Sequence, residues 1–360
     1  MSATILVASA WLAAAFVYRA LSMRALSALC RVQDHDFDPV PPEGALVAFR
    51  PLHGFLTRLE HSLETLWRAA ARGGVRVVVG AADRGDPALR VAARVAARWP
   101  EVRSEIRVGP GPAGLNRKLA NLSQMSAGID SDLLLLSDAD IAVPEDYVLR
   151  LTRPFKDADV GLVTCPYRSV PAAGLASRLD ALITNIHFLP SACLATRLEG
   201  LHFALGATIA VRTTALSQSG GFESLLDTPA DDFLLARHIE RAGWRLAWSP
   251  MVVEHLLEPE GWVAAARRHL RWARVVRHMR PLGYLGQLVT HGSIPALLLA
   301  ATGGGLWIPW AWWALEGVWL WRRRETLSLR LSDLAAVPLA DLLAFAVFLG
   351  GMRGPARGPS

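Results

Sequence analysis

The middle of the chain alternates short apolar runs with amphipathic helical patterns, and this alternation limits the possible folds most strongly. The runs that we interpret as strands cover residues 45–49, 75–80, 106–108, 132–136 and 160–165. The helical patterns that separate the first four runs cover residues 56–71, 87–97 and 115–127. We therefore predict an α/β fold with a mostly parallel sheet and helices on both faces. Ligands of such sheets bind beyond the carboxyl ends of the strands, so we expect a functional site there.

Apolar segments are predicted at both ends of the chain. Hydrophobic residues make up 52% of the sequence and charged residues 19%, a balance too apolar for an ordinary soluble enzyme. Residues 3–18 are almost all apolar, and Arg19, Arg24 and Arg31 follow them. Because these charges come after the apolar run, a membrane anchor with its C-terminal side in the cytoplasm fits better than a cleaved signal peptide.

Three further apolar segments follow Pro281, over residues 282–301, 306–321 and 334–351. Each approaches the ~20 residues that a helix needs to cross a bilayer, although the first contains a glutamine and a histidine and is the weakest. The predicted organisation is an anchor over 1–22, a cytoplasmic domain over 40–257, an amphipathic interfacial helix over 258–281, membrane segments over 282–352 and a disordered tail over 353–360.

The net charge and the spacing of the cysteines argue against several classes of function. The net charge of +6, in so apolar a chain, favours an anionic membrane surface or a phosphate-bearing substrate over nucleic acid. Cys30, Cys165 and Cys193 form no CxxC pair, so we expect neither a zinc site nor a disulfide framework. His187 and His202 are more typical of core or interface histidines than of catalysts.

Carboxylates follow two of the predicted strands. Asp83 and Asp86 come after the second run, and Asp86 precedes a proline, so it also fits an ordinary helix N-cap. Asp138 and Asp140 come after the fourth run, where two neighbouring carboxylates repel each other unless a cation lies between them. Their hard oxygen atoms suit Mg²⁺ or Mn²⁺, and a solvated acidic turn is the alternative.

Two more polar pairs lie at predicted helix starts. Asn116 and Lys118 follow a segment rich in glycine and proline, where a helix N-terminus and a lysine can bind an anion. A solvated basic turn explains that pair equally well. Asp231 and Asp232 precede the helical pattern 233–242, where they either complement the helix dipole or provide a general base.

A basic helix is predicted over residues 262–280. Arg268, Arg271 and Arg274 recur every third residue and therefore share roughly one face. Such a helix, with Trp272 beside membrane segments, could lie on the bilayer. Arginine is also the side chain best suited to a diphosphate, because its planar guanidinium donates two parallel hydrogen bonds.

Taken in order, these motifs resemble the membrane-bound family-2-like glycosyltransferases. The resemblance is closest to the ceramide glucosyltransferase group (family 21 type), which includes bacterial enzymes that glycosylate hopanoids. The segments that carry it are 50–54 (Arg-Pro-Leu-His-Gly), 83–88, 116–122, 137–140, 161–163, 166–167, 220–222, 231–232, 243–245 and 268–272 (Arg-His-Leu-Arg-Trp). Three positions depart from the pattern: Arg50 replaces a lysine, and Asp140 and Asp231 stand where the animal ceramide enzyme has Gly and Glu.

The resemblance implies a GT-A-type, Rossmann-like domain, a UDP-sugar donor and a divalent cation, Mg²⁺ or Mn²⁺. It makes Asp232 the catalytic base with Asp231 beside it, and it assigns the metal to Asp138 and Asp140. The donor-binding residues that it implies are Arg50, Pro51, Asp83, Asp86, Asn116, Lys118, Asp138, Arg268, Arg271 and Trp272.

The expected activity is inverting transfer of a sugar, from a donor like UDP-glucose, to the hydroxyl of a membrane lipid such as ceramide. Transfer of N-acetylglucosamine or another hexose to a hopanoid is the alternative. A processive polysaccharide synthase is a further one, for which three or four membrane segments look too few to form a channel. We expect an integral protein of the bacterial inner membrane with its catalytic domain in the cytoplasm and no nucleic-acid partner.

Overall fold

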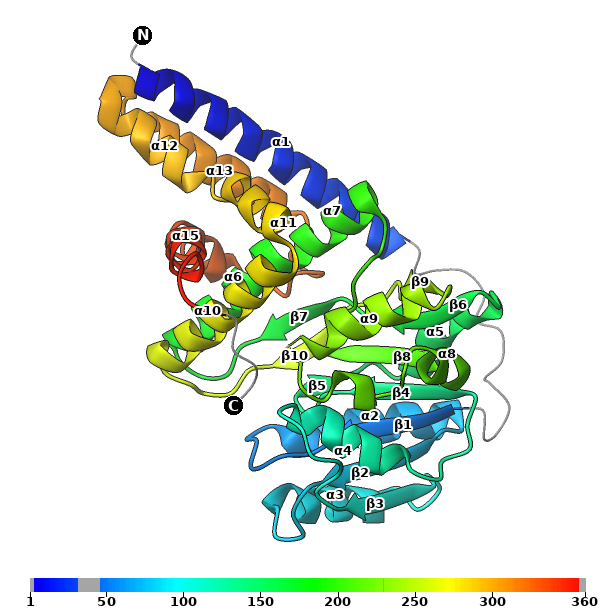
Figure 1. Cartoon of the computed structure of the whole chain (residues 1–360). Helices are drawn as coiled ribbons and strands as arrows, with labels where there is room; N and C mark the ends of the chain where they lie inside the picture. Colours follow the sequence, from blue (N-terminus) through cyan, green and yellow to red (C-terminus); the bar gives the residue numbers. More distant parts are fainter. Residues whose placement is uncertain (1–2, 32–45, 229, 356–360) are drawn as a thin grey trace. The chain divides into compact units, whose positions relative to one another are not determined.

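The computed structural model describes residues 3–31, 46–228 and 230–355, and the chain divides into two compact units. Unit 1 comprises Met1–Arg31, Arg168–Leu198 and Pro259–Arg357. Unit 2 comprises Val32–Tyr167, Glu199–Glu258 and Gly358–Ser360. Figure 1 labels the elements of both units. Residues 40–45 of the predicted domain and 356–360 of the predicted tail lie outside the described residues.

Unit 2 is built on a seven-stranded sheet with the order β3-β2-β1-β4-β8-β6-β9 (Figure 1). Its strands are β1 (Leu46–Pro51), β2 (Arg76–Ala81), β3 (Ser104–Val108), β4 (Leu133–Ser137), β6 (Val160–Thr164), β8 (Thr208–Arg212) and β9 (Arg245–Trp248). Strand β8 runs antiparallel to β4 and β6, and the other pairs are parallel. The predicted mostly parallel α/β sheet is therefore confirmed.

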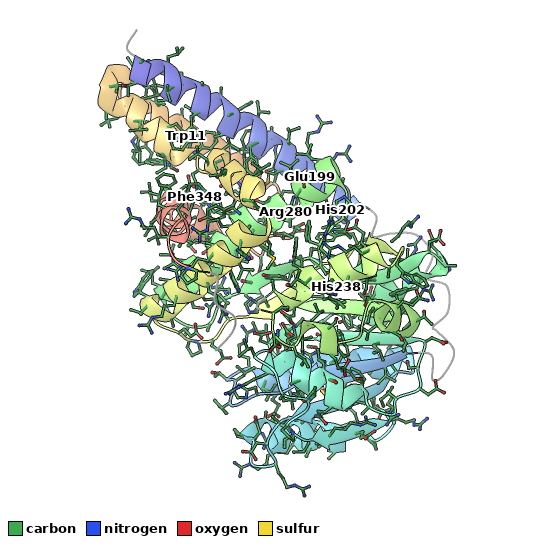
Figure 2. The ribbon with its side chains drawn as sticks, viewed as in Figure 1. Trp11, Glu199, His202, His238, Arg280 and Phe348 are labelled. Carbon is green, nitrogen blue, oxygen red and sulfur yellow. The ribbon has the colours of Figure 1, made fainter. Side chains whose placement is uncertain are left out.

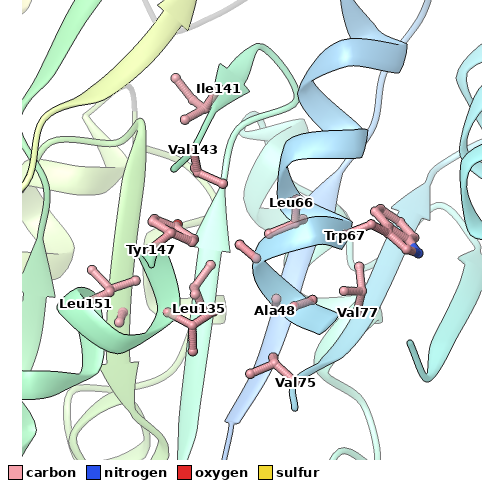
Figure 3. Close-up of a cluster of buried hydrophobic side chains, with 14 of the residues drawn as sticks. Ala48, Leu66, Trp67, Val75, Val77, Leu135, Ile141, Val143, Tyr147 and Leu151 are labelled. Atoms are coloured by element: carbon pink, nitrogen blue, oxygen red, sulfur yellow. The ribbon is translucent and has the colours of Figure 1, made fainter. Parts of the chain in front are cut away.

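Helices cover both faces of this sheet, because alternate strand residues point to opposite sides. On one face Ala48 and Val77 pack with Leu66 and Trp67 of helix α2 (Figure 3). On the other face the buried cluster contains Val47, Phe49 and Val78 with residues of α4 and α9. The helices of unit 2 are α2 (Leu59–Gly73), α3 (Pro87–Arg98), α4 (Arg117–Ser126), α5 (Tyr147–Thr152), α8 (Thr213–Gln218) and α9 (Asp231–Arg241), with short 3₁₀ turns η1 (Arg153–Lys156) and η3 (Glu223–Leu225).

A second, smaller pairing lies beside the end of β4. Strand β5 (Ile141–Ala142) pairs antiparallel with β10 (Val253–Leu256), so that His255 lies opposite Ile141. This pairing fixes the backbone that directly follows Asp138 and Asp140. Strand β7 (Tyr167–Val170) carries the chain from unit 2 into unit 1.

Unit 1 is helical. Its elements are α1 (Ala3–Arg31), α6 (Leu175–Ile183), η2 (Thr184–Phe188), α7 (Leu189–Glu199), α10 (Trp262–Met279), α11 (Pro281–Gly286), η4 (Gln287–Thr290), α12 (Ser293–Leu299), η5 (Ala300–Gly304), α13 (Trp307–Trp321), α14 (Leu331–Leu334) and α15 (Val337–Gly351). Segments η2 and η5 have π-helical hydrogen bonding.

Helix α1 is long and apolar enough to cross a membrane. Its segment Ala3–Leu29 contains 27 residues, and an 18-residue window within it has a mean hydropathy of 1.6, with 17% of that window buried. The segment predicted over 282–301 is instead broken, with a bend of 52° between Pro281–Thr290 and Ser293–Gly304. Gly292 lies at this break against Trp312, where a side chain would meet the indole ring at 2.0 Å.

Arg19 and Arg24, which follow the N-terminal apolar run, have different surroundings. Arg19 is 1% exposed, forms an ion pair with Glu316 of α13, and donates from Nη1 to the carbonyl of Ile186 at 2.7 Å. A buried, paired arginine does not contribute to the surface charge that orients a membrane helix. Within the described side chains of α1, Arg24 is exposed.

Candidate active site

The carboxyl ends of β2, β1 and β4 lie side by side in the sheet, which brings three predicted motifs to one edge. Asp86 begins helix α3, and its Oδ1 accepts the backbone N–H of Ala88 at 2.9 Å. Its Oδ2 accepts the N–H of Gly54, in the loop after β1, at 2.9 Å. The two predicted roles of Asp86 are therefore compatible, because the helix cap also joins the loop after β1 to the loop after β2.

Asp83 shapes the loop between β2 and α3. Its Oδ1 accepts the N–H of Gly85 at 2.9 Å, and its carbonyl accepts the N–H of Asp86 at 3.2 Å. Pro51 is the last residue of β1, and the next residue, Leu52, donates its N–H to the carbonyl of Gly80 at 2.7 Å. These backbone bonds hold both loops at the strand ends.

Arg50 stabilises the backbone of the site. Its side chain is fully buried, and Nη1 donates to the carbonyls of Asp138 and Ile141, the second at 2.9 Å. Burial lowers the pKa of this guanidinium to about 10, against the attraction of nearby acidic groups. We predicted that Arg50 contacts the donor; in the structure it holds the backbone on which Asp138 and Asp140 stand.

Lys118 lies at the centre of the acidic residues. Its Nζ lies 2.5 Å from Asp138 Oδ1 and 3.9 Å from Asp231 Oδ2, and it donates to the carbonyl of Gly206 at 3.2 Å. Burial alone would lower the pKa of Lys118, but the carboxylates of Asp138 and Asp231 outweigh it and raise the pKa. Lys118 therefore stays charged and links motifs from α4, β4 and α9.

Asn116 positions Lys118 through the start of α4. Its Oδ1 caps the helix by accepting the N–H of Leu119 at 3.1 Å, and its Nδ2 donates to the carbonyl of Thr228 at 3.2 Å. The residue is 1% exposed. We predicted a donor-binding role for Asn116; its observed bonds give it the role of fixing the helix that carries Lys118.

Asp232 lies in the first turn of α9 and carries a perturbed carboxylate. Its Oδ2 accepts the N–H of Gly206 at 2.8 Å, and its Oδ1 accepts the N–H of Phe233 at 2.7 Å. Burial, and then the charge of Asp231, raise the pKa of Asp232 to about 6. Such a carboxylate is a stronger base than an ordinary one and is still ionised at neutral pH.

A histidine that the sequence did not single out contacts Asp140. Its partner is His255 of β10, whose Nε2 lies 3.3 Å from Asp140 Oδ2 and whose ring packs edge-on against Tyr167 at 5.7 Å between centroids. Burial would raise the pKa of Asp140, but the hydrogen bond and charge of His255 outweigh it and lower the pKa. No spacing pattern in the sequence links residues so far apart along the chain.

Asp138 and Asp140 are the two carboxylates that the sequence predicts as ligands of a divalent cation. Burial raises the pKa of Asp138 to about 6, and the negative charge of Asp140 adds to this effect while Lys118 opposes it. A cation that bridges the two carboxylates would relieve this repulsion. Two carboxylate oxygens leave the remaining positions of a Mg²⁺ or Mn²⁺ shell for water and phosphate oxygens.

The remaining predicted donor residues belong to helix α10 of unit 1. Arg268 forms ion pairs with Glu260 and Asp180, and its guanidinium lies 6.0 Å from the ring centroid of Trp272. Arg274, predicted to share a face with Arg268, donates to the carbonyl of Arg353 at 3.0 Å. These arginines therefore stabilise unit 1 internally.

Arg271 of the same helix is exposed, which leaves its guanidinium open to an anionic ligand.

His202, which we predicted to be a core or interface histidine, is exposed and has local partners in unit 2. Its Nδ1 contacts the carboxylate of Glu240, and its Nε2 lies 2.8 Å from the carbonyl oxygen of Glu199. Figure 2 labels His202 and Glu199. These contacts hold the imidazole of His202 in place.

Comparison with solved structures identifies the fold. A mannosyltransferase from Pyrobaculum calidifontis, solved with GDP-mannose and Mn²⁺, superposes with a TM-score of 0.58 at 18% identity, over 96% of this chain and 99% of that chain. A glucosyl-3-phosphoglycerate synthase from Mycobacterium tuberculosis matches with a TM-score of 0.40 at 14% identity, over 67% of this chain and 86% of that chain. The fold is therefore of the GT-A glycosyltransferase type, as predicted.

The family assignment comes from the sequence match. The model of glycosyl transferase family 21 matches residues 7–356, which includes both units and every motif described above. The protein is an enzyme of the glycosyltransferase class, and the chain belongs to glycosyl transferase family 21.

Proposed function

We propose that this glycosyltransferase moves one sugar from a UDP-sugar to the hydroxyl of a membrane lipid, with inversion at the anomeric carbon. The observation that carries the proposal is the arrangement around Gly206: Lys118 donates to its carbonyl, and Asp232 accepts its N–H. Lys118 also forms an ion pair with Asp138. The proposed base Asp232 and the predicted metal ligand Asp138 are therefore linked through Gly206 and the positive charge of Lys118.

Asp232 is proposed as the base that removes the proton of the acceptor hydroxyl. Its two backbone hydrogen bonds fix the carboxylate, and its raised pKa increases its proton affinity. A positioned base of this kind contributes about 10²- to 10⁴-fold to a rate. One base, with no second carboxylate assigned as a sugar nucleophile, supports a single displacement and hence inversion.

Asp138 and Asp140 are proposed to hold the divalent cation that accompanies the donor diphosphate. When bound, such an ion stabilises the negative charge that develops on the departing nucleotide. Lys118 holds the carboxylate of Asp138, and His255 holds that of Asp140. Mn²⁺ with a nucleotide sugar in the Pyrobaculum mannosyltransferase agrees with this proposal.

Donor binding is proposed for the loops after β1 and β2, with Pro51, Asp83, Asp86 and Asn116 as supports. The bonds of Asp86 to both loops support a rigid nucleotide cradle at the sheet edge. Rigid loops of this kind lower the entropy that is lost when a ligand binds. Arg271 and Trp272 are proposed to meet the diphosphate or the acceptor.

The acceptor is proposed to be a lipid because of the apolar elements of unit 1. Helix α1 supports a membrane anchor, and the bent pair α11 to η5 supports a second insertion. We propose the domain boundaries 1–22, 40–257, 258–281, 282–352 and 353–360, and a cytoplasmic catalytic domain at the bacterial inner membrane. Ceramide and hopanoids are the acceptor classes to distinguish.

The test is incubation of the detergent-purified chain with a panel of UDP-sugars and membrane lipids, followed by mass spectrometry. We expect one lipid class to gain the mass of a single sugar residue. Products with many sugars would instead indicate a processive synthase. Release of free sugar with every lipid tested would argue against a lipid acceptor.

A further inference from the structure

Three polar residues meet in the interior of unit 1, in a place that the proposed sugar transfer does not use. They are His187 of the π-helical turn η2, His291 at the break before α12, and Asp341 of α15. All three are buried, with Asp341 fully so and the two histidines 8% and 4% exposed. Their ligand atoms lie within 4.8 Å of one another.

Both imidazoles approach one oxygen of Asp341 at the spacing expected of ligands around one small ion. His291 Nδ1 lies 3.0 Å from Asp341 Oδ1, and His187 Nε2 lies 3.5 Å from the same oxygen. An ion about 2.0–2.1 Å from each nitrogen and oxygen would place neighbouring ligand atoms about 3 to 3.5 Å apart. The two nitrogen–oxygen separations therefore suit ligands of one ion, and all three ligand atoms lie within 4.8 Å of one another.

The imidazole ring of His187 lacks a hydrogen-bond partner among the described residues. Neither of its ring nitrogens makes a hydrogen bond within the described residues, although both are buried. A buried polar group without a partner is rare and costs free energy. Its ring lies 5.2 Å from the ring of His291, centroid to centroid, and its Nε2 faces Asp341.

The surroundings hold the other two ligands in place. Asp341 Oδ2 accepts the backbone N–H of Ser293 at 2.9 Å, which leaves Oδ1 directed at both imidazoles. The ring of His291 packs against Phe345 and Phe348, the latter labelled in Figure 2. Partners of this kind orient metal ligands and raise the affinity of a site.

The backbone around the site is irregular where the histidines lie. His187 belongs to a π-helical turn, and His291 lies at the 52° break between two short helices. Such turns and breaks occur often at functional sites, because they aim side chains that a regular helix would place elsewhere. Asp341 is an ionisable residue in an otherwise apolar helix, where such residues are rare and functional.

We propose that His187, His291 and Asp341 bind a divalent first-row transition ion such as Zn²⁺. The ion would join three segments of unit 1, namely α6–η2–α7, the break before α12, and α15, and it would leave a further coordination position for water. We expected no zinc site because the cysteines form no CxxC pair, but the three ligands proposed here include no cysteine. The proposal does not depend on the identity of the sugar or the lipid.

Ligand chemistry separates this ion from the one proposed at the donor site. Two imidazole nitrogens with one carboxylate suit Zn²⁺ and its neighbours, whereas the oxygen ligands Asp138 and Asp140 suit Mg²⁺ or Mn²⁺. The two sites can therefore be emptied and filled independently.

The test measures zinc content in the full chain, purified in detergent with a tag that contains no histidine. The protein is stripped with chelator, incubated with excess Zn²⁺, desalted and analysed by mass spectrometry for metals. We expect about one zinc per chain in the wild type and in the Asp138→Asn/Asp140→Asn double variant. His187→Gln and His291→Gln should lose it, and His278→Gln, at an exposed histidine of α10, should keep it.

A second measurement needs no variant. X-ray absorption of the zinc-loaded wild type should show imidazole scattering from two histidines, which an oxygen-only site cannot produce. A desalted wild type without zinc would overturn the proposal and leave a hydrogen-bonded polar cluster. Equal zinc in folded His187→Gln, or a zinc spectrum without imidazole, would overturn it as well.

Discussion

The replacement Asp232→Asn tests the proposed base with the least change to the site. Asparagine keeps the size of the side chain and one acceptor oxygen, so it can keep one of the two backbone bonds, to Gly206 or to Phe233. Loss of the other bond costs about 1–3 kcal/mol of stability. Loss of the base costs about 10²- to 10⁴-fold in kcat, since an amide cannot accept the proton.

The assay follows glycolipid formation at saturating donor, with UDP binding measured by calorimetry on the same samples. We expect kcat to fall by that factor while UDP binding remains measurable, because Asp232 is not assigned to the nucleotide. Asp130→Asn, at an exposed aspartate of unit 2, is the matched control and should retain full activity. Full activity in Asp232→Asn would refute the assignment of the base.

Other consequences can be measured on the same enzyme. Because the base must be ionised and its pKa is raised to about 6, kcat should fall as the pH drops below about 6, and a rate independent of pH from 7 to 5 would contradict this. EDTA should abolish transfer through the Asp138–Asp140 pair, and added Mn²⁺ or Mg²⁺ should restore it; turnover unaffected by chelator would contradict the metal site. His255→Ala should weaken activation by the metal about 10- to 100-fold, as a titration of Mn²⁺ would show. Gly206→Ala should lower kcat in a folded protein, because the new Cβ would lie 3.0 Å from Asp232 Oδ2.

Local patterns in the sequence predicted a large part of the sheet. The strands β1, β2, β4 and β6 were predicted within one or two residues, because each is a short, largely buried apolar run next to a helix. Polar residues directly after these runs located the site, since parallel strands end at one edge. The helix N-cap at Asp86 could likewise be predicted from the proline that follows it.

Local sequence patterns did not predict the contacts between residues far apart in the chain. Strand β8 lies between β4 and β6 although it follows both in the chain, and nothing local encodes that pairing. The contact of His255 with Asp140 depends on β10 pairing with β5, and the burial of Arg50 and of Arg19 depends on packing. Arg268 was predicted to bind the donor, and its ion pair with Asp180 joins it to a segment 88 residues away along the chain.

The most direct test of the account is the product made by the purified wild-type enzyme from an α-linked UDP-sugar and the lipid that the panel identifies. Mass spectrometry should show a single added sugar, and the coupling constant of the anomeric proton in the NMR spectrum should show a β linkage. An α-linked product, or a sugar polymer without lipid, would contradict single displacement onto a lipid hydroxyl at the site formed by Asp138, Lys118 and Asp232.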